Sequence, residues 1–269
     1  MNIYELAKQG IMTPEVEFIA EKEGLAKKEI LNKLNRGSIC IFKNTTRDIK
    51  PVAVGSGLTT KVNANIGSSP DLFDIDIELQ KLHTAINAGA DAVMDLSTGG
   101  NLIKFRQTII QECSVPLGTV PLYEMAVNLS KQQKSVMDMT IEDYLLVVQK
   151  QAEEGVDFMT IHSGITKESI KSLKSHDRIV GITSRGGSIL AEWMAQNNKE
   201  NPLFEYYDEI LEILKKYNVV ISLGDGLRPG AINEANDRGQ IHEMIVLGEL
   251  TKRAREKGVQ AIIERPGHM

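Results

Sequence analysis

Two glycine-rich stretches that contain arginine could bind an anion. The first, SRGGS at residues 184–188, lies between a predicted strand and a predicted helix. Glycines let backbone N–H groups approach an anion there, the helix N-terminus adds its positive dipole, and Arg185 could hold a phosphate through two hydrogen bonds. The second, GDGLRPG at residues 224–230, places Asp225 and Arg228 just past a strand. Each stretch alone also fits an ordinary turn with a surface ion pair, but two of them together favour an anionic ligand.

Other polar side chains stand where predicted strands end. His162 closes the stretch FMTIH, and Tyr123 and Glu264 follow two other strands. A lone histidine at a strand end is more often structural than catalytic, but its polar neighbours here favour a ligand contact. The strand-end residues that we single out are Asn63, Asn65, Met94, Asp95, Tyr123, His162, residues 184–187, residues 225–228, Glu264 and His268.

The stretch ERPGH at residues 264–268 brings a carboxylate and an imidazole close together in the sequence. Both Glu264 and His268 could bind a metal, but a catalytic zinc usually has three protein ligands. Further ligands would have to come from elsewhere. The residues by themselves therefore predict a phosphate-binding site whose reaction is unknown.

Strands must carry these side chains, and the apolar pattern predicts seven of them. They cover residues 61–66, 91–96, 115–122, 157–162, 179–184, 218–223 and 259–264, with helices expected over 140–155, 204–217 and 231–257. This alternation without a GxGxxG turn favours an α/β fold of the (β/α)8 TIM-barrel type, in which chemistry lies at the carboxyl ends of the strands. Seven predicted strands leave that barrel incomplete by one.

The first 57 residues have a different pattern. A helix is predicted to begin after Thr13 and to end near Gly24, and a second one covers residues 26–36 and is closed by Gly37. A strand over 38–42 follows. We therefore divide the chain into a small α+β segment, residues 1–57, and a barrel portion, residues 58–269.

The composition is that of a globular protein, with 42% hydrophobic and 25% charged residues and a net charge of −5. No basic block suggests nucleic acid, and no apolar run reaches the roughly 18 residues of a membrane span. Two cysteines, Cys40 and Cys113, cannot form a disulfide framework or a thiolate cluster by themselves. Without a signal-peptide pattern at the N-terminus, we expect a cytoplasmic protein without nucleic-acid or membrane partners.

Eight motifs in order give the chain a specific resemblance. They are NANIGSS (63–69), GADAVMDLSTGG (89–100), PLGTVPLYE (116–124), QAEEGVDFMTIHSG (151–164), GITSRGGSILAEW (181–193), SLGDGLRPGAINEAND (222–237), LGELTKRA (247–254) and ERPGH (264–268). Together they resemble the phosphomethylpyrimidine synthase family of thiamine biosynthesis, from the N-terminal helices to the last residue.

The resemblance implies a radical conversion of 5-aminoimidazole ribotide to 4-amino-5-hydroxymethyl-2-methylpyrimidine phosphate. It further implies S-adenosylmethionine, a [4Fe-4S] cluster, zinc and a homodimer. By matching motif positions, the residues that resemble the family's substrate contacts are Asn65, Met94, Tyr123, His162, Ser184, Arg185, Gly186, Asp225, Gly226, Leu227, Arg228 and Glu264. His268 resembles the first of two zinc-binding histidines.

Two departures from the family pattern affect these expectations. Arg265 replaces the first glycine of the usual Glu-Gly-Pro-Gly-His, beside Glu264. The family's eighth strand, second zinc histidine and CxxCxxxxC cluster motif have no match, since neither Cys40 nor Cys113 fits it. We therefore expect these 269 residues to be the first part of a longer enzyme and to be inactive alone. Two alternatives stay open: the related 5-hydroxybenzimidazole synthase, which uses the same ribotide, and a non-catalytic barrel that only binds it.

Overall fold

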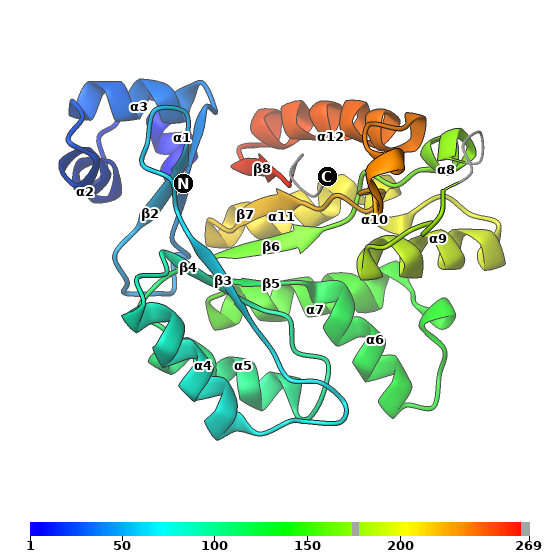
Figure 1. The fold of residues 1–269 in the computed structure, drawn as a ribbon. Helices are drawn as coiled ribbons and strands as arrows, with labels where there is room; N and C mark the ends of the chain where they lie inside the picture. The colour runs from blue at the N-terminus through cyan, green and yellow to red at the C-terminus, as the bar shows by residue number, and fades with distance from the viewer. Residues whose placement is uncertain (174–177, 265–269) are drawn as a thin grey trace.

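The computed structural model describes residues 1–173 and 178–264. Within them, eight strands form a two-stranded and a six-stranded sheet. Figure 1 shows the small sheet and the first three helices grouped at one end of the larger sheet, with the other helices packed around it.

The N-terminal segment has the predicted helices and strand. The Thr13 hydroxyl accepts a hydrogen bond from the Val16 N–H at 3.4 Å, and Gly24 ends the helix in a left-handed conformation with φ of 66°. A first helix and the second strand of the hairpin were not predicted. The elements are α1 (Ile3–Lys8), α2 (Pro14–Glu23), α3 (Lys27–Asn35), β1 (Ile39–Phe42) and β2 (Val52–Gly55), the last two antiparallel.

Strand β1 separates two hydrophobic cores. Ile39 and Ile41 pack with the helices of the N-terminal segment, whereas Cys40 and Phe42 belong to the core of the larger sheet. The rings of Phe42 and Phe158 meet edge to face, with centroids 5.2 Å apart. Alternate side chains of one strand thus join the two parts of the chain.

Two buried polar clusters also hold the N-terminal segment against the larger sheet. The Asp157 carboxylate accepts hydrogen bonds from the Asn44 N–H at 2.7 Å and the Leu117 N–H at 2.8 Å, and it is paired with Arg47. The Gln260 side chain accepts from the Ile41 N–H at 2.7 Å and donates to the Ile41 carbonyl at 3.1 Å. The Gln260 amide therefore pairs with β1 as a neighbouring strand would.

The larger sheet is parallel, and its strands follow one another in chain order. In register, Thr160 lies opposite Ser222, and Ser222 lies opposite Ile262. All six carboxyl ends consequently lie at one edge, where the sequence places its polar residues. The strands are β3 (Asn63–Ile66), β4 (Ala92–Asp95), β5 (Leu117–Thr119), β6 (Phe158–Ile161), β7 (Val220–Leu223) and β8 (Ala261–Ile263).

Helices connect these strands, and the three predicted helical stretches are all present. Thr140 caps α7 and Gly155 ends it in a left-handed conformation, whereas stretches 204–217 and 231–257 each include a short helix or 3-10 turn before the main helix. Among the described residues, none of the helices has the length and apolarity needed to cross a membrane. The elements are α4 (Ile75–Asn87), α5 (Leu102–Glu112), α6 (Pro121–Lys131), η1 (Val136–Asp138), α7 (Ile141–Glu154), α8 (Lys167–Leu173), α9 (Arg185–Asn197), α10 (Pro202–Glu205), α11 (Tyr207–Tyr217), η2 (Ile232–Glu234) and α12 (Arg238–Lys257).

The predicted strand over residues 179–184 was wrong, and so was the count of seven strands in the sheet. Strands β6 and β7 pair directly with each other, so no strand can lie between them. Ile179 and Val180 are 76% and 52% exposed. The Val180 N–H donates to the Glu234 carboxylate at 2.8 Å instead of to a neighbouring strand.

The described part of the chain is therefore an α/β fold with six parallel strands, preceded by an α+β segment. In it, β3 and β8 each pair with one neighbour and form the two ends of the sheet. Closure into an eight-stranded barrel, and the domain boundary at residue 57, stay predictions.

Candidate functional site

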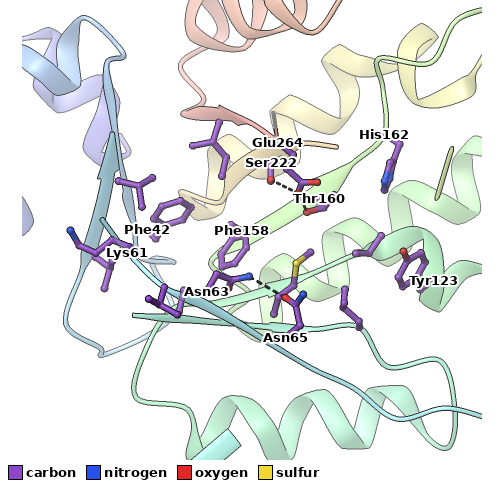
Figure 2. A pocket seen from close by; sticks show the side chains of 18 of the residues that line it. Phe42, Lys61, Asn63, Asn65, Tyr123, Phe158, Thr160, His162, Ser222 and Glu264 are labelled. Carbon is purple, nitrogen blue, oxygen red and sulfur yellow. Dashed lines mark hydrogen bonds between the residues drawn. The ribbon is translucent and has the colours of Figure 1, made fainter. Parts of the chain in front are cut away.

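A cavity of about 630 Å³ runs along one face of the parallel sheet, from the β1–β2 hairpin to the carboxyl edge. Figure 2 shows its side chains, with Phe42 and Lys61 at one end and Tyr123 and His162 at the other. Its size falls in the roughly 300–1,000 Å³ range of small-molecule sites. The lining residues are Phe42, Val52, Val54, Lys61, Val62, Asn63, Asn65, Ala92, Met94, Leu96, Val120, Tyr123, Phe158, Thr160, His162, Ser222, Arg228, Ile262 and Glu264.

Strand alternation decides which side chains enter this cavity. Phe158, Thr160 and His162 are two residues apart and all line it. The same spacing brings in Asn63 with Asn65, and Ile262 with Glu264. Because side chains alternate between the two faces of a sheet, these pairs point to the same face and bring both apolar and polar side chains into the cavity.

Glu264 is held by two hydroxyl groups from neighbouring strands. Its Oε1 accepts hydrogen bonds from Thr160 Oγ1 at 2.6 Å and from Ser222 Oγ at 2.7 Å. Its N–H donates to the Leu223 carbonyl at 3.0 Å, which continues the ladder between β7 and β8. The chain therefore keeps the carboxylate inside the cavity at the carboxyl edge, as Figure 2 shows.

His162 is buried at the same edge, and burial lowers the pKa of its imidazole to about 4. The positive charge of Arg228 also lowers this pKa, while Glu264 opposes the shift. Within the described residues its Nδ1 has no hydrogen-bond partner. The ring is therefore neutral at pH 7, with a buried Nδ1 that lacks a partner among the described residues.

Arg228 lines the cavity next to a buried acid. Its Nη1 lies 3.2 Å from Asp225 Oδ1, and its side chain is 30% exposed whereas that of Asp225 is 3% exposed. The loop that carries this pair is fixed by the Leu227 N–H, which donates to Glu243 at 2.9 Å. A fork of five N–H donors bound to one carboxylate oxygen retains donors for an anion.

The SRGGS stretch begins helix α9, as predicted. The Ser184 hydroxyl caps it by accepting from the Gly187 N–H at 3.2 Å. The Arg185 guanidinium lies over the Tyr123 ring, 5.4 Å from its centroid. Burial raises the pKa of the Tyr123 hydroxyl, so that it stays protonated and can donate a hydrogen bond at neutral pH.

The predicted site residues fall into two groups. Asn65, Met94, Tyr123, His162, Arg228 and Glu264 line the cavity, and Asn65 accepts a hydrogen bond from Asn63 at 3.2 Å. The second group lies next to the first, at the start of helix α9 and in the loop after β7: Ser184, Arg185, Gly186, Asp225, Gly226 and Leu227. His268 and Arg265 lie outside the described residues.

Sequence reasoning missed Thr160 and Ser222. Both are buried, at 3% and 2% exposure, and both touch Glu264. A signal was available, because Thr160 precedes His162 by two residues and therefore shares its face of the strand. Polar residues in the middle of a buried strand indicate a partner in the same way as those at its end.

The cysteines do not fit an iron–sulfur cluster. Cys40 Sγ donates to the Ala261 carbonyl at 3.3 Å, and Cys113 Sγ donates to the Val115 carbonyl at 3.1 Å. Burial raises the pKa of both thiols, that of Cys40 to about 12, which disfavours the thiolates that a cluster needs. In the part of the chain that the structure describes, no three His, Cys, Asp or Glu side chains are grouped to hold a metal ion.

Comparison with known proteins places this chain in a family. A model of the Radical SAM ThiC family matches residues 2–269, so the chain belongs to that family. Phosphomethylpyrimidine synthase of Thermodesulfovibrio yellowstonii is 49% identical over 269 residues, which are 100% of this chain and 63% of that protein. The enzyme of the same name from Methanocaldococcus jannaschii is 49% identical over 263 residues, 98% of this chain and 62% of its own length.

These matches confirm the resemblance seen in the sequence motifs. The chain spans about 63% of the length of the curated relatives that it matches. Among solved structures, a dihydropteroate synthase from Thermus thermophilus aligns with 83% of this chain and 92% of its own at 13% identity. Its TM-score of 0.30 is too low to indicate a common fold.

Proposed function

We propose that this chain forms the ribotide-binding part of a phosphomethylpyrimidine synthase. The substrate would be 5-aminoimidazole ribotide and the product 4-amino-5-hydroxymethyl-2-methylpyrimidine phosphate. Family membership and the names of its relatives support the assignment. The observation that carries it is the meeting, in one cavity, of a carboxylate, a neutral imidazole and an arginine, contributed by Glu264, His162 and Arg228.

The arginines are suited to the phosphate end of the ligand. Arg228 lines the cavity with its side chain partly exposed, and Arg185 lies in the first turn of helix α9. The N-terminus of a helix attracts negative charge through its free N–H groups and its dipole. We assign the phosphate to this side of the cavity, with Arg185 and Arg228 as its cationic partners.

The carboxylate and the imidazole are suited to the amino-imidazole end. An ionised Glu264 can only accept hydrogen bonds, which matches an amine or hydroxyl donor on the ligand. Neutral His162 can donate from one ring nitrogen and accept at the other. The protonated Tyr123 hydroxyl and the Asn65 amide complete a set of polar groups that can hold the ligand in one orientation.

A radical SAM family implies an iron–sulfur cluster and S-adenosylmethionine, which generate the radical when they are bound. Because Cys40 and Cys113 do not fit that cluster, we assign no step of the radical chemistry to this chain. We propose instead that the 269 residues bind the ribotide without converting it. Anaerobic incubation with S-adenosylmethionine and a reductant should then release no 5′-deoxyadenosine above background, and repeated turnovers would contradict this.

Calorimetric titration tests the binding function directly. The 269-residue chain should bind 5-aminoimidazole ribotide and should bind its dephosphorylated nucleoside more weakly. Absence of ribotide binding would exclude the proposed function.

Product analysis with the complete, cluster-reconstituted enzyme would distinguish the pyrimidine from a 5-hydroxybenzimidazole. The homodimer and the zinc role of His268 stay predictions, to be tested by sedimentation and by metal analysis of a His268→Ala variant.

A further inference from the structure

Thr160 and Ser222 form a pair of hydroxyl groups that face the same carboxylate oxygen. They are register partners on the adjacent strands β6 and β7. Glu264 follows β8 and lies two residues beyond Ile262, the register partner of Ser222. Its side chain therefore reaches back across two strands, and Oε1 lies 2.6 Å from Thr160 Oγ1 and 2.7 Å from Ser222 Oγ.

In this geometry both hydroxyl groups donate their protons to the Glu264 carboxylate. Each hydroxyl has a single proton, and both protons point to Oε1, so neither is available to a ligand. Within the described residues, the second oxygen, Oε2, accepts no hydrogen bond. Hydrogen bonds from neutral donors to a charged acceptor are stronger than bonds between neutral groups, and two of them restrain a side chain that otherwise has three rotatable bonds.

Both hydroxyl groups are buried and therefore need a hydrogen-bond partner within the protein. Thr160 and Ser222 are 3% and 2% exposed. A buried hydroxyl without a partner is costly, and apolar residues would fill these strand positions as well. The carboxylate, and not the packing of the strands, therefore accounts for hydroxyl groups at these two positions.

From this arrangement we infer that Thr160 and Ser222 are positioning residues that orient Glu264 so that Oε2 faces the cavity to accept a hydrogen bond from an N–H or O–H group of the ligand. The inference rests on the proposed function for the identity of that ligand. The orientation of the carboxylate does not depend on it. Two separate measurements can therefore test the orientation and its use in binding.

Crystal structures of the ligand-free 269-residue protein test the orientation. In a Thr160→Val/Ser222→Ala variant, the Glu264 carboxylate should leave its position or become distributed over several conformers. It should stay in place in Thr160→Ser, which keeps the hydroxyl. It should also stay in Thr251→Val, which removes a buried hydroxyl of α12 that donates to the Leu247 carbonyl at 2.8 Å. A carboxylate that keeps its wild-type position in the double variant would overturn the inference.

Calorimetric titration with 5-aminoimidazole ribotide tests the use of this orientation. Thr160→Val should raise the Kd about tenfold, the effect of one hydrogen bond to a charged group. Added to Glu264→Ala, the same change should raise the Kd less than about twofold, because the group through which it acts is gone. Thr160→Ser should bind nearly as the wild type does. An equal loss in both backgrounds would mean that Thr160 acts without Glu264 and would refute its positioning role.

Failure of the proposed function and failure of a variant to fold can both be distinguished from failure of the inference. If the wild-type chain binds no ribotide, the proposed function fails, and the crystal structures still decide the orientation. If the double variant does not fold, the single variants Thr160→Val and Ser222→Ala take its place in both measurements, with circular dichroism as the check on folding.

Discussion

The ring of His162 packs directly against the backbone of Gly186, so that a methyl group on this glycine would lie 2.4 Å from the imidazole Cε1. A methyl group on Gly224 would lie 2.8 Å from Cδ2 of the same ring. The two glycines belong to the two arginine-containing stretches, Gly186 to the first turn of helix α9 and Gly224 to the loop after β7. Their lack of side chains therefore serves the placement of the imidazole as well as any approach of an anion.

Gly186→Ala should displace this imidazole. The new methyl group overlaps a buried ring that packs against Gly186 and Gly224, and overpacking of this kind costs about 1–3 kcal/mol in the free energy of unfolding. Urea denaturation measures the loss. Gly248→Ala is the matched control, because a methyl group there meets nothing within 4 Å on helix α12. The control should be neutral or stabilising by up to about 1 kcal/mol, and an equal loss in both variants would contradict the packing argument.

The low pKa of His162 should make the fold sensitive to acid. Its imidazole has a pKa near 6.5 when unfolded and about 4 when folded. Below about pH 6.5 the unfolded chain therefore takes up a proton that the folded chain does not. The free energy of unfolding should fall as the pH drops from about 6.5 to about 4, by at most about 1.4 kcal/mol per pH unit from this group. Above pH 6.5 the group contributes no pH dependence.

Urea denaturation at several pH values checks this slope. His162→Gln should lose the pH dependence that the imidazole contributes. The difference in the free energy of unfolding between wild type and variant should therefore change between about pH 6.5 and about pH 4. His83→Gln is the control, since the side chain of His83 on α4 is half exposed. A His162→Gln variant with the slope of the wild type would mean that His162 does not carry the acid sensitivity.

Arg185 and Arg228 should bind the phosphate of the ribotide. Replacing either with alanine should weaken ribotide binding by about 1.5–3 kcal/mol, the range for hydrogen bonds to charged groups. The loss should be much smaller for the dephosphorylated nucleoside. Arg253→Ala is the control, because Arg253 is paired with Asp208 on the outer helices α11 and α12, at 2.6 Å. Equal losses for the two ligands would mean that neither arginine contacts the phosphate.

The Arg47–Asp157 pair should be essential to the joint between the N-terminal segment and the sheet. The two side chains are 5% and 0% exposed, so Asp157→Asn leaves a buried guanidinium without its counter-charge. Breaking a buried pair in this way costs about 3–5 kcal/mol. Asp208→Asn removes an acid from exposed pairs and should cost less than about 1 kcal/mol. Thermal unfolding followed by circular dichroism compares the two variants, and similar costs would argue against an anchoring role.

The strand-end residues could be predicted because parallel strands bring their carboxyl ends to one edge. His162, Arg228 and Glu264 were found in this way, and all three line the cavity. Thr160 and Ser222 lie within strands β6 and β7, and not at their ends, so the strand-end pattern does not include them. Their partner, Glu264, lies 104 and 42 residues away in sequence. No local pattern reveals a hydrogen bond across such a separation.

The errors in the fold have a similar origin. Residues 179–184 have the β-branched, apolar character of a strand, but pairing of β6 with β7 leaves them without a place in the sheet. Strand β2 was not predicted because it has only four residues, which do not alternate between apolar and polar, and the last of them is Gly55. In both cases the neighbouring strand, and not the segment itself, decides whether a strand forms.

The Gln260 amide that pairs with Ile41 also bears on the order in which the chain folds. The two residues are 219 positions apart, so a newly synthesised chain exposes the edge of β1 long before its partner exists. Closing a loop of that length carries an entropic cost that grows with the logarithm of its size, and contacts of such sequence separation form late. The Asn44 and Arg47 contacts to Asp157 can therefore attach the N-terminal segment earlier, whereas the pairing of β1 with Gln260 must wait for the strand that leads to Glu264. The two residues that flank β8, Gln260 and Glu264, thus supply the partner of the β1 edge and the carboxylate of the binding cavity.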